Sequence, residues 1–84
     1  MTDLDSAHRA TVAKIFGHGE NVEWREVRSL LDAVATVTER HNGKLEVTLG
    51  DETEVLEPPR DKDVDVQMLV DLRRMLRGAG IEPS

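Results

Sequence analysis

One histidine in this sequence has a basic residue close to it on each side along the chain. His41 directly follows Arg40, and only Asn42-Gly43 separates it from Lys44. An imidazole can give or take a proton near neutral pH, and neighbouring cations can hold a phosphate group. The three residues therefore form a candidate site for RNA cleavage, with His41 as the acid or base. The alternative interpretation is a surface histidine beside a turn.

Three arginines near the C-terminus form a second basic group, at Arg73, Arg74 and Arg77. Their spacing would allow them to follow a phosphate backbone from one helix. In the last turns of a helix such residues also match the negative end of the helix dipole, so a solvated face is the alternative.

The acidic residues are concentrated in one stretch. Residues 46–65 contain eight of the seventeen Asp and Glu residues but only two of the eleven Lys and Arg residues, so this stretch carries the whole net charge of −6. An acidic surface repels phosphate and attracts basic proteins. Glu52, Glu54 and Glu57 are the candidate residues for binding such a partner.

No metal or cofactor site is predicted. The alternating aspartates of residues 61–65 resemble the start of a calcium loop, but Val66 stands where glycine is needed and Leu72 where a bidentate Glu belongs. His8 and His18 have no partner at ligand spacing and are expected on the surface.

The length and composition of the chain further limit the classes of protein to which it can belong. Eighty-four residues suit one small domain, and the absence of cysteine excludes disulfides and thiolate zinc sites. No apolar run is long enough for a membrane span, and the N-terminus is acidic where a signal peptide would be basic. We expect a cytoplasmic protein with no membrane contact.

Two helices are predicted in the first part of the chain. The first runs from about Ser6 to Phe16, capped by Asp5 or Ser6, with an apolar face of Ala10, Val12, Ala13 and Phe16. A loop ending at Asn21 follows, and Asn21 is expected to cap a helix from Val22 or Glu23 to about Val34. Its apolar stripe begins at Trp24, which we interpret as a core anchor.

From Ala35 the apolar period changes to two, which predicts three strands. A three-residue loop, Asn42-Gly43-Lys44, would pair Val37 with Leu49 and give Gly43 the positive φ of a bulged turn. A second three-residue connection, Gly50-Asp51-Glu52, would set Val55 against Val47. Pro58-Pro59 ends the third strand.

A last helix is predicted after this connection, capped by Asp63 or Asp65. Its expected buried stripe comprises Val66, Leu69, Leu72, Leu76 and Ala79, widened by Val70 and Met75, and Gly78 and Gly80 end it. The fold class is therefore α+β: a two-layer domain with an extra N-terminal helix and then α-β-β-β-α around a three-stranded antiparallel meander. We expect residues 1–21 to form the helix and loop, 22–81 the domain and 82–84 a tail.

This order of elements resembles the HicA-type toxin family, small ribonucleases with a double-stranded-RNA-binding-domain-like fold and an antitoxin partner. The resemblance covers about Trp24 to Ile81. It rests on Leu30-Leu31, Val55-Leu56-Glu57-Pro58-Pro59, Lys62-Asp63 and the run of residues 72–81. The family's catalytic Gly-Ser-His run is absent, and His41-Asn42-Gly43-Lys44 occupies its place.

The resemblance implies a domain that binds RNA or an antitoxin-like protein, or both. Its basic surface would comprise Arg40, Lys44, Arg73, Arg74 and Arg77, with His41 as the catalytic group if the chain is an endoribonuclease. The alternative is a non-catalytic protein-interaction module that binds a basic partner through residues 46–65. A homodimer joined through a sheet edge is a third hypothesis, since a meander leaves two edges open.

Overall fold

The computed structural model describes residues 5–17 and 21–83 of the chain. In these residues the elements follow the order α1 (Ser6–Phe16), α2 (Trp24–Val34), β1 (Thr36–Glu39), β2 (Leu45–Leu49), β3 (Glu52–Leu56) and α3 (Val66–Gly78). The strands form one antiparallel sheet in the order β1-β2-β3. The predicted α+β class is confirmed.

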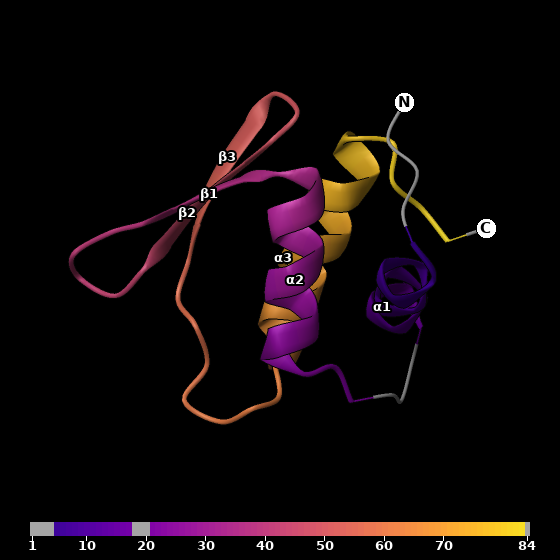
Figure 1. The fold of residues 1–84 in the computed structure, drawn as a ribbon, viewed down its shortest axis with the longest axis horizontal. Helices are drawn as coiled ribbons and strands as arrows, with labels where there is room; N and C mark the ends of the chain where they lie inside the picture. Colours follow the sequence, from indigo (N-terminus) through magenta and orange to yellow (C-terminus); the bar gives the residue numbers. More distant parts are fainter. Residues whose placement is uncertain (1–4, 18–20, 84) are drawn as a thin grey trace.

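The core lies between one face of the sheet and the helices. β2 alternates strictly, with Leu45, Val47 and Leu49 buried and the two residues between them half-buried. Figure 1 shows α2 and α3 side by side, with α1 on their far side from the strands. Val12 and Ile15 of α1 belong to the same buried cluster as β2, so the first helix shares the core of the others.

The start of α2 differs from the prediction. Glu23, not Asn21, precedes the helix, and it forms a reciprocal capping box with Glu26. The reason is a short antiparallel bridge to the segment before α3, in which Trp24 N donates to Lys62 O at 2.6 Å and Val64 N donates to Val22 O at 2.9 Å. The bridge keeps Val22 extended and buried, so the helix begins after it.

The other two caps are among the predicted alternatives. Asp5 accepts from His8 N at 2.9 Å and Asp65 accepts from Met68 N at 2.8 Å. Val66 and Val70, however, are 75% and 46% exposed and do not belong to the buried stripe of α3. Val64, just before the Asp65 cap, is buried instead, and Leu69 packs against the same core; these are the two positions of a hydrophobic staple.

The first hairpin has a three-residue loop, but one residue earlier than predicted. Arg40 N donates to Lys44 O at 2.8 Å, so His41-Asn42-Gly43 forms the loop, and Val37 lies opposite Val47 instead of Leu49. Gly43 has the expected positive φ, at 86°. A shift of the partner by two residues keeps Val37 on the buried face, which explains why alternation alone did not distinguish the two registers.

The second hairpin was predicted wrongly. Its turn is two residues, Gly50-Asp51, and it places Leu49 opposite Glu52 and Val55 opposite Glu46. Gly50 has φ of 62°, which suits the first central position of a tight II′ turn. The one-residue change moves Val55 to the outer face, where it is 54% exposed, and brings Glu54 to the helix-facing side opposite Val47.

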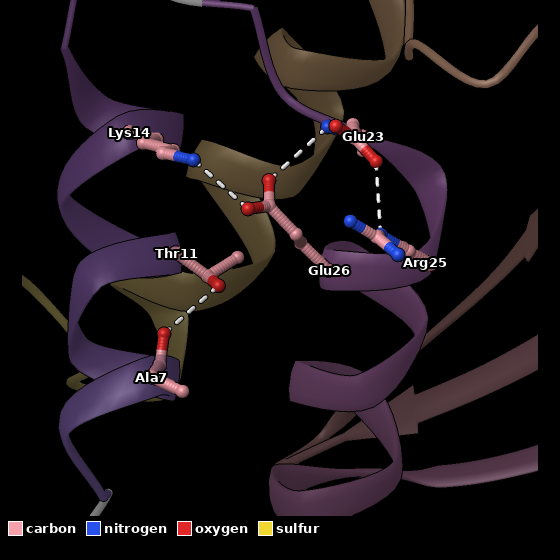
Figure 2. A network of polar contacts seen from close by, with 6 residues as sticks. All are labelled: Ala7, Thr11, Lys14, Glu23, Arg25 and Glu26. Atoms are coloured by element: carbon pink, nitrogen blue, oxygen red, sulfur yellow. Dashed lines mark hydrogen bonds and ion pairs between the residues drawn. The ribbon is translucent and has the colours of Figure 1, made fainter.

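An ion pair also joins α1 to α2. Lys14 Nζ donates to Glu26 Oε1 at 2.8 Å, while Glu26 Oε2 accepts from Glu23 N at 3.2 Å (Figure 2). The hydrogen bond from Lys14 lowers the pKa of Glu26. The carboxylate of Glu26 therefore stabilises both the helix start and the contact with α1.

We expect Glu26→Gln to lower the free energy of unfolding at pH 7 by about 1 kcal/mol, since it removes an ion pair and weakens a cap. Because the folded-state pKa of Glu26 is depressed, its contribution is present above its ordinary pKa and is lost as the pH falls through the folded value. Urea denaturation should therefore show a smaller deficit at about pH 3 than at pH 7. Glu82→Gln, on an exposed residue, is the control; equal deficits at both pH values would contradict the assignment.

Candidate functional site

The predicted basic residues do not form one surface. Arg40, His41 and Lys44 lie at the β1–β2 loop, whereas the Gly50 turn at the other end of β2 lies against Ala79, the residue that ends α3. β2 is five residues long, about 16 Å at the usual rise of a strand. The strand thus separates the hairpin group from the last turns of α3.

Two of the three arginines of α3 make contacts that hold the fold together. Arg73 Nε donates to Ile15 O at 2.6 Å and its Nη2 donates to Gly17 O at 3.3 Å, which caps the C-terminal end of α1. The Arg77 guanidinium lies 5.4 Å from the centre of the Phe16 ring, also on α1. Both side chains connect the first helix to the last.

The other two arginines of the predicted basic surface form ion pairs with glutamates of β2 and β3. Arg74 pairs with Glu54 of β3, and Arg40 Nη1 lies 2.5 Å from Glu46 Oε1 of β2. Both pairs are partly exposed, so their contribution to stability is small, but each neutralises a cation that was predicted to bind phosphate. Glu54 was a predicted protein-binding residue, and this contact half-buries it on the helix side of the sheet.

The hairpin loop leaves His41 and Lys44 exposed. Asn42 Oδ1 accepts from Lys44 N at 3.1 Å and so holds the loop backbone. Within residues 5–17 and 21–83, no hydrogen bond or ion pair joins the His41 ring to another residue. RNA cleavage requires an acid and a base, and this loop supplies one imidazole without a second titrating group in contact with it.

The acidic stretch has more carboxylates than cations to pair with them. Of its eight acidic residues, only Glu46 and Glu54 form ion pairs in the described part of the chain. The others, which extend from the β2–β3 turn to the start of α3, are Asp51, Glu52, Glu57, Asp61, Asp63 and Asp65. Figure 1 shows that β3 and the connection to α3 follow the side of the molecule away from α1.

β3 is also an edge strand, because it pairs only with β2. Its exposed Val55 lies opposite Glu46 and two residues before the exposed Glu57, on the outer face of the sheet. The two-residue turn makes Leu49 and Glu52 a hydrogen-bonded pair, and by alternation the amides of Thr53 and Val55 point toward the open edge. The edge therefore combines free backbone groups, one apolar side chain and negative charge.

Sequence reasoning missed the contacts of His8. Its ring is half-buried and lies between Asp5, three residues earlier, and Ser29, which is on α2. The Asp5 and His8 spacing at a predicted helix start was a visible signal. Ser29 is 21 residues away, and only the packing of α1 on α2 brings it to the ring.

The described residues contain neither a metal-ligand cluster nor a membrane-spanning helix. Here no three His, Asp or Glu side chains lie close enough to hold a metal ion. Among the same residues, no helix is long and apolar enough to cross a membrane. The chain matches no protein-family model, no curated protein and no solved structure.

We expect Arg73→Met to lower the free energy of unfolding by about 1.5 to 3 kcal/mol, because it removes charged hydrogen bonds to two carbonyl groups of α1. Arg74→Met is the matched control and should cost less than about 1 kcal/mol, since it removes a partly exposed ion pair. Urea denaturation of both variants measures the difference. Equal losses would show that the contacts to α1 contribute little.

Proposed function

We propose that this protein is an interaction module that binds a basic, extended segment of a partner protein along β3 and the acidic residues beside it. The observation that carries the proposal is the excess of unpaired carboxylates along an open strand edge. The proposal joins two independent features, charge and backbone geometry, in one place.

Charge supports a basic partner. Glu52 is the first residue of β3 and Glu57 directly follows its last residue. Both are exposed, and neither has a cationic partner in the described part of the chain. Lysine or arginine side chains of a bound segment would meet these carboxylates, and complementary charge of this kind increases the association rate and specifies the partner. The same charge repels the phosphates of nucleic acids.

Backbone geometry supports an extended partner. An exposed edge strand offers amides and carbonyls that a peptide can pair with by adding a strand to the sheet. Natural proteins usually protect such edges with proline, lysine or bulges. β3 contains no proline or lysine over Glu52–Leu56, its charged residues are both glutamates, and its exposed Val55 offers an apolar contact for one side chain of the added strand.

The same features argue against a second copy of this chain as the occupant. Two β3 edges paired antiparallel would bring Glu52 and Glu57 of one copy close to acidic residues of the other. Like charges across a strand pair are destabilising. A basic segment is therefore the better match for this edge.

A synthetic peptide that alternates valine and lysine is a direct probe, with a version carrying glutamate in place of lysine as its control. Fluorescence anisotropy should show binding of the lysine peptide only, and Glu52→Lys/Glu57→Lys should weaken it by about tenfold or more because the charge match is reversed. Glu82→Lys/Asp32→Lys makes the same change in charge away from β3 and should have a much smaller effect. Equal loss in both double variants would exclude a specific site on β3.

Val55→Pro tests the strand addition itself. Proline removes one outward-pointing amide but is tolerated on an edge strand. We expect loss of peptide binding with circular dichroism unchanged. Retained peptide binding would contradict strand pairing and would show that the acidic charges alone are enough for binding. Self-association of the wild-type chain in analytical sedimentation would favour the homodimer instead.

RNA binding is the second candidate, as the HicA resemblance implies, and the observation that favours it is the exposed His41 and Lys44 at the tip of the first hairpin. The family's antitoxin partner is a protein, so the first proposal is compatible with the same resemblance. Cleavage would need His41 to act with a second group supplied by the RNA or by a partner.

For RNA, we expect weak binding. The logarithm of the association constant should fall with the logarithm of the salt concentration with a slope of about −1 to −2, because few phosphates are contacted. Lys44→Ala should reduce the slope. Glu52→Lys/Glu57→Lys should strengthen RNA binding while it weakens peptide binding, so the two functions respond in opposite directions. Identical, negligible RNA cleavage by the wild type and His41→Ala would remove the enzyme hypothesis.

A further inference from the structure

A second arrangement of side chains lies between α1 and α2, far from β3. His8 Nδ1 is 3.2 Å from Asp5 Oδ1, and His8 Nε2 is 2.9 Å from Ser29 Oγ. One ring nitrogen thus contacts a carboxylate and the other contacts a hydroxyl. This is the order of contacts by which an acid, an imidazole and a serine activate the hydroxyl as a nucleophile.

The fold holds the imidazole in one orientation. Asp5 is the N-cap of α1, and its Oδ1 accepts from the backbone amide of His8 as well as lying beside the ring. In the tautomer that carries its hydrogen on Nδ1, the nitrogen beside the carboxylate, the lone pair of Nε2 is directed at the Ser29 hydroxyl. The His8 side chain is only 18% exposed, because α2 covers it.

Ser29 is more exposed to solvent than the His8 ring. Ser29 lies in the middle of α2 and is exposed, and it borders an open hollow of about 370 Å³. The α1 wall of the hollow is formed by the small residues Ala7, Ala10 and Thr11 beside His8. A short acyl group fits against such a wall, whereas the hollow offers no deep apolar pocket for a long one.

A positive charge borders the same hollow. Arg25 precedes Ser29 by one turn of α2, which places both on the same face of the helix, and its side chain is 85% exposed. It contacts Glu23 at 2.9 Å and remains open to solvent. Figure 2 shows Arg25 and Glu26 on α2 with Ala7 and Thr11 on α1. A guanidinium at this position can stabilise an oxyanion near Ser29.

We propose that Asp5, His8 and Ser29 form a serine-nucleophile site that hydrolyses small, activated carboxylic esters. Ser29 Oγ attacks the ester carbonyl carbon as His8 Nε2 takes the hydroxyl proton. The tetrahedral intermediate, with Arg25 beside its oxyanion, then releases the alcohol, which receives the proton from His8. Water deprotonated by His8 attacks the acyl-serine, releases the carboxylic acid and restores the Ser29 hydroxyl.

The probe is 4-nitrophenyl acetate, with its hydrolysis followed by the release of 4-nitrophenolate at about pH 8. The wild type should hydrolyse it about tenfold or more faster than Ser29→Ala, since a positioned base typically contributes 10²- to 10⁴-fold and this site lacks the backbone donors of a full oxyanion hole. Ser29→Ala keeps all three histidines, so it measures the hydrolysis that histidines perform without the serine. Ser6→Ala, on an exposed serine outside the hollow, should match the wild type.

Two further measurements separate catalysis from folding. Mass spectrometry of protein quenched during turnover should locate an acetyl group on Ser29, and Ser29→Cys should accumulate an acetyl thioester. Asp5→Asn should lower the rate with α1 retained by circular dichroism, because the imidazole loses its orienting carboxylate. Equal rates for the wild type and Ser29→Ala, or an acetyl group found only on lysines or other histidines, would overturn the proposal.

Discussion

The short antiparallel bridge between residues 22–24 and 62–64 sets the frame of this protein. It buries Val22 and Val64 and joins the start of α2 to the segment just before α3. Because the two helices begin at the same point and run in the same direction, both lie on one face of the sheet formed by the chain between them (Figure 1). A pairing between residues about forty positions apart has a loop-closure cost that local contacts do not, and the buried β2 residues and helix stripes offset it.

Arginine contacts then add α1 to this frame. Arg73 satisfies carbonyl groups at the C-terminal end of α1, and Arg77 covers Phe16 of the same helix. Two residues that resemble a phosphate-binding set in the sequence are therefore used to connect helices. The general point is physical: a guanidinium has five donors in a plane and suits helix-end carbonyls as well as it suits phosphates. A basic cluster in a sequence does not distinguish the two.

The register of the second hairpin determines which side chains of β3 are exposed on the acidic side of the molecule. With a two-residue turn at Gly50-Asp51, Glu54 faces the helices and pairs with Arg74, while Val55 is exposed among acidic neighbours. A turn one residue longer would exchange these roles, because successive side chains of a strand point to opposite faces. An exposed valine on an open, acidic edge is the feature on which the proposed interaction surface rests, and it results from this one-residue choice.

Local patterning in the sequence determined the elements and their type: α1 within the observed bounds, α2 to its last residue, three strands, a loop closed by Gly43 and an Asp-capped last helix. Helical periodicity, alternation and glycine conformation act over a few residues and can therefore be recognised without the fold. Tertiary structure alone decided the hairpin registers, the replacement of Asn21 by Glu23 as a cap, the partners of the arginines and the meeting of His8 with Ser29. These depend on which distant backbone or side-chain group arrives at a given point, and sequence spacing carries no information about that distance.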